Sequence, residues 1–370
     1  MLSRLGTSHL LATTGLLIAV GPFLVYSASA ARSELTFESS TVYLVRQLEG
    51  LLVGGLAALL LSRASPVLLR RTGILMWAGT VALLAATLTP LGIEQHGSRR
   101  WLQLGPMVVQ PLELMKLGLI LGLAQWLSGN GERLRDLRFG VGVPLLIGVG
   151  IPALLLLMQP DFGGALLLTL FAVTLTFAAG VRMSHLAASA VVGLPIAAWL
   201  ALGESYRLGR IHSFLDPFAD PSGQGYQLIQ SFLAFGAGGL FGTGLGAGRQ
   251  KLGFLPEAHT DFILSVIGEE LGLVGVTLIL TTLAMFGLAT LAIASRARDR
   301  YGLLLATGAG LLIWLQGLVN AAVATGILPT TGTTLPLVSY GRSSLVTSLA
   351  AVGLILNVAR PARRGRRGWR

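Results

Sequence analysis

The chain has 370 residues, of which 53% are hydrophobic and only 12% are charged. Its mean hydropathy of +0.74 exceeds what the surface of a water-soluble protein tolerates, so we expect lipid as the surrounding solvent. The absence of cysteine excludes a disulfide framework, a thiolate metal site and a cysteine nucleophile.

Ten apolar stretches are long enough to cross a bilayer as helices, which takes about 20 residues each. They lie near residues 10–31, 43–62, 73–91, 112–128, 140–158, 164–180, 186–203, 262–294, 302–324 and 343–358. None has the period-two alternation of an outer-membrane barrel strand. We therefore predict one all-α polytopic membrane domain over residues 1–370, with ten transmembrane helices. No internal repeat is visible, which disfavours a transporter built from inverted halves.

The first apolar stretch ends in the residues Ser27-Ala-Ser-Ala-Ala31, a pattern that also occurs at signal-peptidase sites. The stretch is longer than the hydrophobic region of a usual signal peptide, and an even helix count requires it. We interpret it as a retained first helix.

The basic residues indicate the orientation of the chain in the membrane. A net charge of +11 is compatible with a nucleic-acid partner. Most of the 27 basic residues, however, fall in the segments that are cytoplasmic if the N-terminus is inside. The positive-inside rule then predicts that both termini are cytoplasmic. We interpret the arginine-rich tail, residues 359–370, as an anchor at an anionic leaflet rather than a nucleic-acid-binding segment.

Most carboxylates fall in the predicted external loops or at the outer ends of helices, where we expect the function to lie. The largest external loop runs from about residue 204 to 261, between the seventh and eighth predicted helices. It is too long for a passive connection.

Charges on spanning helices need a physical reason, because each costs roughly 2.5–3.5 kcal/mol on insertion scales. Glu113 and Lys116 are three residues apart and share a helix face, which favours either a structural ion pair or part of a site. The nearby Arg99 and Arg100 are compatible with interfacial anchors. Asp161 precedes an apolar stretch, and we expect it to cap that helix.

Another polar segment leads into the eighth predicted helix. If this helix begins near His259, then Asp261, Ser265 and Glu269 lie one turn apart on a polar stripe. With Arg249 and Lys251 nearby, the segment has the ingredients of an acid-base site facing an anionic ligand. A packing network is the alternative interpretation.

A further polar segment, residues 330–344, precedes the last predicted helix. Its backbone polar groups would be unpaired in hydrocarbon, so it must line a cavity or pack against protein.

These segments resemble the SEDS family (shape, elongation, division and sporulation), whose members FtsW and RodA are peptidoglycan glycosyltransferases. The matching strings are Arg46-Gln-Leu48, Arg99-Arg-Trp101, Gln110-Pro111 with Glu113 and Lys116, Pro160-Asp161 with Gly163, Leu255-Pro-Glu-Ala-His-Thr-Asp-Phe-Ile263, Gly268-Glu-Glu-Leu-Gly272 and Leu335-Pro-Leu-Val-Ser-Tyr-Gly341. They follow the family's order over most of the chain. The strings Asp216-Pro-Phe-Ala-Asp-Pro221 and Gly225-Tyr-Gln-Leu228 look more like FtsW than RodA.

Two departures from the family pattern are visible. Arg342 stands at the second glycine of the family's Ser-Tyr-Gly-Gly-Ser-Ser, where it adds a cation to the external cavity or pairs with a carboxylate. Leu112 and Met115 replace small residues common around the family's Pro-x-Glu-x-x-Lys.

The resemblance implies a SEDS-type bundle in a bacterial inner membrane that polymerises lipid II on the external side, expelling undecaprenyl diphosphate, for septal synthesis in cell division. It implies Asp261 as the catalytic general base. The candidate pyrophosphate ligands are Arg46, Arg99, Arg100, Lys116, Arg249 and Lys251. The supporting candidates are Glu113, Asp161, Glu257, His259, Glu269, Glu270, Ser339 and Tyr340. A Mg²⁺ or Mn²⁺ ion is a possible aid at the pyrophosphate.

The resemblance also implies partners, namely a class B penicillin-binding protein with transpeptidase activity and other division proteins. No nucleic-acid partner is expected. Three alternative functions remain open from the sequence: a lipid II flippase, a RodA-type elongation polymerase, and a non-catalytic scaffold for division proteins.

Overall fold

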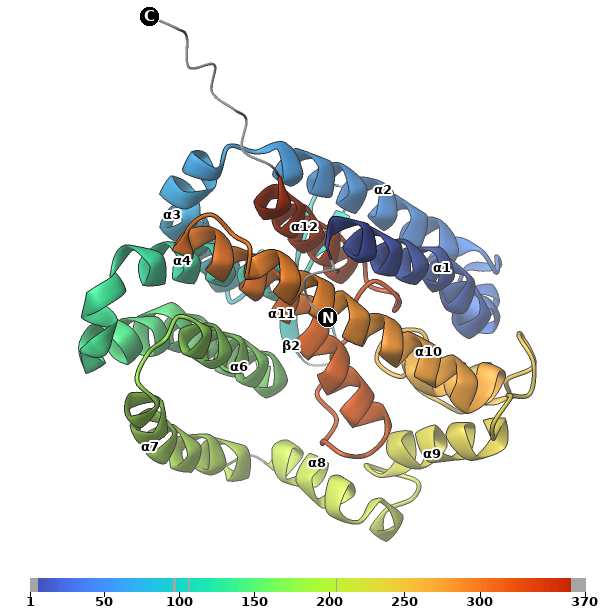
Figure 1. Cartoon of the computed structure of the whole chain (residues 1–370). Coiled ribbons are helices and arrows are strands. Elements are labelled where there is room, and N and C mark those ends of the chain that lie inside the picture. Colours follow the sequence, from blue (N-terminus) through green and yellow to red (C-terminus); the bar gives the residue numbers. More distant parts are fainter. Residues whose placement is uncertain (1–5, 96–97, 106, 204, 361–370) are drawn as a thin grey trace, which may run out of the picture.

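The computed structural model describes residues 6–95, 98–105, 107–203 and 205–360, which form a bundle of long helices (Figure 1). The first helices are α1 (Thr7–Phe37), α2 (Val42–Arg63), α3 (Pro66–Ala86) and α4 (Pro111–Gly129). A π-helical segment, Arg138–Val149, continues into α5 (Gly150–Met158), followed by α6 (Phe162–Ala178) and α7 (Met183–Leu202). The remaining helices are α8 (Ser205–Leu215), α9 (Tyr226–Gly238), α10 (Ile263–Ala294), α11 (Arg300–Ala324) and α12 (Arg342–Ala359).

Eight helices of the described chain are long and apolar enough to cross a membrane, and they coincide with eight of the predicted spans. The two other predicted spans are the shorter apolar helix α6 and α4, which carries Glu113 and Lys116 in its first turns. The prediction of a helical, multi-pass membrane protein is therefore confirmed. The count of ten spans and the single-domain organisation stay predictions, and residues 361–370 of the basic tail lie outside the described residues.

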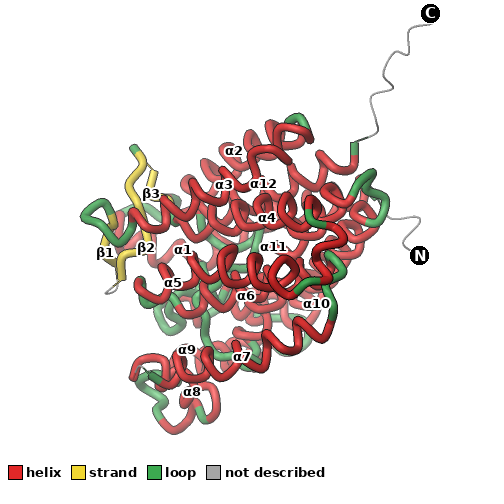
Figure 2. Tube along the Cα trace, turned by 90° about the vertical axis from the view of Figure 1, so that its left-hand side faces the viewer, coloured by secondary structure: helices red, strands yellow, loops and turns green. Residues whose placement is uncertain are grey.

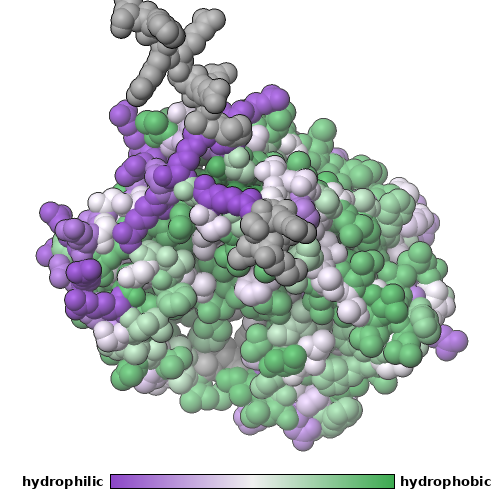
Figure 3. Space-filling model, in the orientation of Figure 1, coloured by the Kyte–Doolittle hydropathy of each residue, from purple (hydrophilic) through white to green (hydrophobic). Residues whose placement is uncertain are grey.

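The helices differ in how deeply they are buried. In their most apolar stretches, 67% of α12 and 61% of α11 are buried, against 6% of α7 and 17% of α2 and α3. The core therefore lies around α10, α11, α12 and α4, and the other helices present apolar side chains outward. Figure 3 shows hydrophobic residues over much of one face, as expected of a surface that meets lipid.

A small antiparallel sheet lies between α3 and α4, a feature that the hydropathy pattern did not predict. Its strands are β1 (Gly92–Gln95), β2 (Ser98–Leu104) and β3 (Met107–Val109), in the order β1-β2-β3. Figure 2 shows the sheet at the end of the bundle opposite to the chain termini. The pairing of β2 with β1 shifts at Arg100, which has no partner in β1, so the regular alternation of side chains is interrupted between Arg99 and Trp101.

The predicted external loop, residues 204–261, is partly helical. It holds α8, α9 and two 3₁₀ turns, Pro217–Ala219 and Gln250–Leu252. Figure 1 shows α7, α8 and α9 following one another along one flank of the bundle, with α9 ending beside α10. The loop therefore forms structure that positions side chains against the bundle, although its exact bounds stay a prediction.

A kink in α10 joins this helix to the end of α9. Gly272 has φ of 67° and ψ of −164°, which breaks the helix into two segments. A Cβ there would lie 2.4 Å from the backbone nitrogen of Gly242, so only glycine fits. The N–H groups of Leu273 and Val274 donate to the carbonyls of Gly239 and Leu240, at 2.9 and 3.2 Å. Backbone groups freed by the kink are therefore paired, which makes the break tolerable in a membrane helix.

Candidate active site

Asp261 lies at the end of a tight loop that precedes α10. The carbonyl of Glu257 accepts hydrogen bonds from the backbone N–H groups of Thr260, Asp261 and Phe262, at 3.1 to 3.2 Å. Glu257 has φ of 55°, a left-handed conformation that a non-glycine residue adopts only at an energetic cost. This loop fixes the backbone of Asp261 before the helix begins at Ile263.

The predicted polar stripe of Asp261, Ser265 and Glu269 along one helix face is wrong. Asp261 precedes the helix, whereas the hydroxyl oxygen of Ser265 lies 2.6 Å from that of Ser231 in α9. Glu269 instead accepts hydrogen bonds from backbone N–H groups of the preceding loop. The stripe fails because α10 begins at Ile263 and not near His259.

A second loop, residues 335–341, packs against the loop that carries Asp261. The hydroxyl of Ser339 donates to the carbonyl of Thr260 at 2.5 Å, and the N–H of Tyr340 donates to the carbonyl of His259 at 2.9 Å. Leu337 in this loop also has a left-handed φ, of 66°. The prediction that this polar stretch packs against protein is confirmed, and the two strained loops hold each other in place.

Asn320 of α11 ties Asp261 to the extended segment before the last helix. Its Nδ2 donates to the carbonyl of Asp261 at 2.7 Å and to the carbonyl of Thr333 at 2.6 Å. Next to Thr333, Gly332 has φ of 72°, and a Cβ built on it would lie 3.7 Å from Oδ2 of Asp261. The carboxylate of Asp261 therefore faces a glycine, which leaves room in front of it.

The surroundings of Asp261 favour its protonated form. Burial, the largest cause, and the Glu257 carboxylate raise the pKa of Asp261, the Arg210 guanidinium lowers it, and together they bring it from 3.8 to about 7. A general base works best with a pKa near the ambient pH, because it is then largely ionised and still basic enough to accept a proton. Asp261 has the electrostatics of such a group.

His259 is held as a neutral, buried ring. It is 4% exposed, and its ring centroid lies 4.7 Å from that of Tyr43 and 5.5 Å from that of Tyr340. Burial lowers the pKa of His259 to about 4, with the Glu257 carboxylate raising it and Arg32 lowering it. The ring therefore packs against the aromatic side chains of α2 and the second loop and stays uncharged at neutral pH.

Arg46 is the candidate cation nearest to this aromatic group. Its side chain hydrogen-bonds with that of Tyr340, and its guanidinium carbon lies 4.9 Å from the centroid of the Phe37 ring. Burial raises the pKa of Tyr340, and the hydrogen bond with Arg46 opposes this rise. Arg46 makes no ion pair with any described residue, so its charge is free to meet an anion.

Lys116 and Glu113 form the predicted structural ion pair. Nζ of Lys116 lies 2.7 Å from Oε2 of Glu113 and donates to Oε1 of Gln316, also at 2.7 Å. Gln316 then donates to the carbonyl of Thr334 at 3.1 Å. Lys116 is 1% exposed, so its charge is compensated inside the bundle.

The two arginines of β2 have different surroundings. Arg99 pairs with Glu94 at 3.3 Å on the protein surface. Arg100 points inward, where its Nη2 donates to the carbonyl of Pro160 at 2.7 Å and its Nε lies 3.9 Å from Oδ2 of Asp161. Asp161 accepts a hydrogen bond from the N–H of Gly164 at 3.0 Å, which confirms the predicted helix cap.

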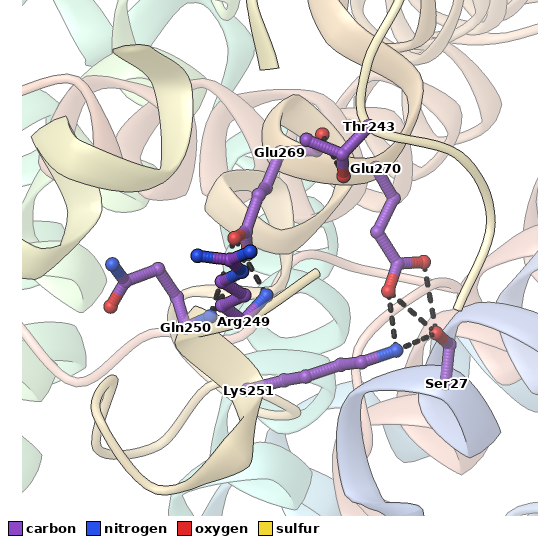
Figure 4. A network of polar contacts seen from close by, with 7 residues as sticks. All are labelled: Ser27, Thr243, Arg249, Gln250, Lys251, Glu269 and Glu270. Atoms are coloured by element: carbon purple, nitrogen blue, oxygen red, sulfur yellow. Dashed lines mark hydrogen bonds and ion pairs between the residues drawn. The ribbon is translucent and has the colours of Figure 1, made fainter. Parts of the chain in front are cut away.

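Lys251 and Glu270 form a buried ion pair beside α1, drawn in Figure 4. Nζ of Lys251 lies 2.5 Å from Oε1 of Glu270 and donates to the hydroxyl of Ser27 at 2.8 Å. The two charged side chains are 8% and 0% exposed. Glu269 accepts from the N–H of Arg249 at 2.7 Å. Within the described residues, no hydrogen bond or ion pair joins this group to Asp261.

Arg342, which departs from the family glycine, pairs with a carboxylate. Arg342 is the first residue of α12, and its Nη1 lies 3.7 Å from Oε2 of Glu49. Glu49 belongs to α2, so the pair links the outer parts of α2 and α12.

The sequence interpretation missed three residues at this site, namely Arg210, Gln316 and Asn320. Nη1 of Arg210 donates to the carbonyl of Thr330 at 2.8 Å, which brings α8 to the segment facing Asp261. Gln316 and Asn320 lie four residues apart on α11, so they share one helix face. Two amide side chains four residues apart in an apolar helix could have predicted a polar face directed into the protein.

No group of three or more His, Asp or Glu side chains within the described ranges is placed to hold a metal ion. A divalent cation at this site would therefore need substrate phosphate oxygens and water as most of its ligands, an arrangement that suits Mg²⁺.

The comparisons with known proteins agree in sequence and in fold. The family model described as "Cell cycle protein", FtsW/RodA/SpoVE, matches residues 8–364. The chain is 43% identical over 344 residues to the "Probable peptidoglycan glycosyltransferase FtsW" of Trichlorobacter lovleyi, covering 93% of this chain and 90% of that protein. It is 40% identical over 352 residues to the "Stage V sporulation protein E" of Bacillus subtilis, covering 95% and 96%.

Two solved structures share the fold. One, described as "Structural coordination of polymerization and crosslinking by a peptidoglycan synthase complex", matches with a TM-score of 0.77 and 34% identity, covering 96% of this chain and 97% of that chain. The other, the rod shape determining protein RodA of Thermus thermophilus, matches with a TM-score of 0.71 and 32% identity, covering 96% of both chains. The chain belongs to the FtsW/RodA/SpoVE family.

Proposed function

We propose that the chain is a peptidoglycan glycosyltransferase that polymerises lipid II into glycan strands at the external face of the bacterial inner membrane, for septal synthesis. The observation that carries the proposal is the environment of Asp261. A carboxylate with a pKa of about 7 faces Gly332 and lies in a segment that matches the family motif. The names of relatives such as the Trichlorobacter lovleyi protein support the reaction type.

In the proposed reaction, Asp261 acts as the general base. The 4-hydroxyl of one lipid II sugar attacks the anomeric carbon of another, and the bond from that carbon to the diphosphate oxygen breaks. The hydroxyl proton passes to the Asp261 carboxylate, and the bonding electrons leave with undecaprenyl diphosphate. Direct displacement inverts the anomeric carbon and needs no covalent enzyme intermediate.

The leaving diphosphate needs positive charge, and the candidate cations differ in how readily they supply it. We propose Arg46 and Arg249 as the main ligands, because neither guanidinium pairs with a carboxylate of the described residues. Arg99 and Arg100 are further candidates from the sheet. Lys116 and Lys251 can contribute only by exchanging a buried carboxylate partner for phosphate. A Mg²⁺ or Mn²⁺ ion at the diphosphate belongs to the proposal.

Asn320, His259 and the second loop position the base. Asn320 anchors the Asp261 carbonyl, and the hydrogen bonds from Ser339 and Tyr340 fix the two residues before it. Because a general base must lie within hydrogen-bond reach of the proton it removes, this support bears directly on the rate.

The partner and the cellular role extend the proposal. A solved relative belongs to a peptidoglycan synthase complex, which supports a class B penicillin-binding protein as the partner. Curated relatives named FtsW support division over elongation. The prenyl tails of both substrates would stay in the bilayer, so that only the sugars and phosphates enter the protein.

The test is polymerisation of lipid II by the purified chain, alone and with its transpeptidase partner. Asp261→Asn should abolish polymer and leave folding intact, whereas Asp136→Asn, an exposed aspartate of the loop after α4, should retain full activity. Near-normal polymer from Asp261→Asn would remove this residue from the mechanism. In proteoliposomes, movement of labelled lipid II without polymer would favour the flippase alternative.

A further inference from the structure

A groove lies between α3 and α4 at the end of the bundle that carries the chain termini. Arg70, on the first turns of α3, pairs with Asp299 at the start of α11, with 3.8 Å between Nη1 and Oδ2. In the same region, Arg298 Nη2 donates to the carbonyl of Arg360. Figure 3 shows hydrophilic residues gathered beside the chain ends, with hydrophobic residues over most of the remaining face. This end is opposite to the sheet and is the predicted cytoplasmic end.

The groove is large enough for a ligand. Its volume is about 500 Å³, within the range of ligand pockets in proteins. Beside the groove, α3 and α4 approach closely at Gly73, where a Cβ would lie 2.4 Å from the carbonyl oxygen of Leu121. The lining residues are Val67, Arg70, Arg71, Ile74, Gln125, Trp126, Gly129 and Asn130.

The polar groups of the groove are suited to an anion. Arg71 is exposed and makes no ion pair with a described residue, and no carboxylate lines the groove. Oε1 of Gln125, a lining residue, accepts from the N–H of Ile74 at 2.7 Å, which fixes the side-chain amide. The Arg70 pair with Asp299 is long, and both side chains are about half exposed, at 49% and 56%. Arg70 therefore loses little free energy when it leaves Asp299 and binds another anion.

The α4 side of the groove contains a tryptophan ring that is held in place. Trp126 donates its indole N–H to the carbonyl of Phe139 at 3.2 Å, and the two rings stack with centroids 6.2 Å apart. Val67 and Ile74 are exposed apolar residues about two turns apart on α3, and they flank Arg70 and Arg71 on the same helix face. The groove therefore combines cations and apolar side chains on α3 with the fixed Trp126 ring on α4, next to the lipid-facing surface of α3.

We propose that this groove binds the phosphodiester headgroup of an anionic phospholipid. The phosphate lies against Arg70, Arg71 and the amide of Gln125, and an acyl chain runs over Ile74, one turn further along α3. Basic pockets between membrane helices on the cytoplasmic side are suited to anionic lipid headgroups. A free phosphate would use the arginines and leave the apolar residues of the groove unused, so a lipid accounts for more of the groove.

The test titrates the detergent-purified full chain with phosphatidylglycerol and counts bound lipid by native mass spectrometry. Phosphatidylcholine and inorganic phosphate form parallel arms. Arg71→Gln removes charge, and Gly129→Leu fills the groove, since a Cβ on Gly129 meets no atom within 4 Å. The matched controls are Arg63→Gln, an exposed arginine at the end of α2, and Gly79→Leu, whose Cβ also meets no atom within 4 Å.

We expect Arg71→Gln to weaken phosphatidylglycerol binding about fivefold, the effect of one arginine near an anionic surface. Gly129→Leu should weaken it at least as much, and both controls should bind like the unmodified chain. Equal loss in Arg63→Gln and Arg71→Gln would show diffuse surface attraction and overturn the proposal. So would equal binding of the two lipids, or displacement of the lipid by inorganic phosphate. Retained binding in Gly129→Leu would place the lipid elsewhere.

Discussion

Removing the charge of Glu257 or of Arg210 should shift the pH dependence of polymerisation in opposite directions. Burial and Glu257 raise the pKa of Asp261 and Arg210 lowers it, which gives a net value of about 7. A general base acts when ionised, so activity should rise with pH through the pKa of Asp261. Glu257→Gln lowers that pKa and moves the rise to lower pH. Arg210→Gln raises it and moves the rise to higher pH.

The size of the shift follows from the charges. Two unit charges several ångströms apart interact by on the order of 1–2 kcal/mol at an effective dielectric constant of about 20, roughly one pKa unit. The Glu257 side chain is 38% exposed and lies 3.5 Å from Arg32, so screening keeps its effect below that limit. Well below the pKa, the ionised fraction falls tenfold per pH unit. A shift of one unit therefore changes the rate on the acid limb up to about tenfold.

The assay is the initial rate of lipid II polymerisation across the pH range in which Asp261 titrates. Glu34→Gln is the matched control, because Glu34 is an exposed carboxylate of α1 that forms no ion pair with a described residue. Its profile should coincide with that of the unmodified chain. His259, with its pKa of about 4, adds no second limb near neutral pH. Shifts of the same sign in both variants, or none, would refute Asp261 as the titrating base.

Four further outcomes are expected. Lys251→Met leaves Glu270 charged and without its ionic partner in the interior, and should destabilise the fold by about 3–5 kcal/mol. The double variant Lys251→Met with Glu270→Leu should recover much of this stability. Thermal unfolding in detergent measures both variants, and an additive loss of stability in the double variant would contradict the buried pair. Asn320→Leu should cut the polymerisation rate about tenfold with little effect on substrate KM, and an unchanged rate would deny its positioning role. Gly272→Ala should lower the unfolding temperature more than Gly55→Ala, whose Cβ meets no neighbour, because the new methyl meets backbone at 2.4 Å. Asp261→Asn removes the cost of ionising a carboxylate whose pKa rises from 3.8 to about 7 on folding. As pH rises from about 4 to about 7, the unfolding temperature of the variant should therefore rise relative to that of the unmodified chain. If both unfolding temperatures depend on pH in the same way, the raised pKa of Asp261 is contradicted.

Features that depend on local sequence were predictable. Hydropathy located the helices because a lipid-exposed backbone must bond within its own segment. The Asp161 cap and the Glu113 to Lys116 pair were also predictable, because both involve residues three apart in sequence. The Asp261 motif was found by resemblance, and its local surroundings were misjudged because the three backbone bonds to the Glu257 carbonyl delay the start of α10.

Features that depend on distant contacts were not predictable. Arg210 reaches the site from α8, and its partner carbonyl belongs to Thr330, 120 residues later in the chain. Lys251 pairs with Glu270 in a group that also includes Ser27, 224 residues away. The sheet that carries Arg99 and Arg100 was missed because its three strands are short and follow no clear alternation. Composition and spacing contain no signal for such pairings.

The structure separates the candidate cations by a criterion that sequence spacing does not supply. Removing Lys116 or Lys251 from its carboxylate partner would leave Glu113 or Glu270 charged and buried, which is strongly unfavourable. These lysines can bind a leaving diphosphate only if that interaction offsets the cost of an unpaired buried carboxylate. Arg46 can bind it without giving up a carboxylate partner. The first contact with the diphosphate should therefore involve Arg46 or Arg249, since neither guanidinium pairs with a described carboxylate, and the buried lysines should serve mainly to hold α4 and α1 against the core.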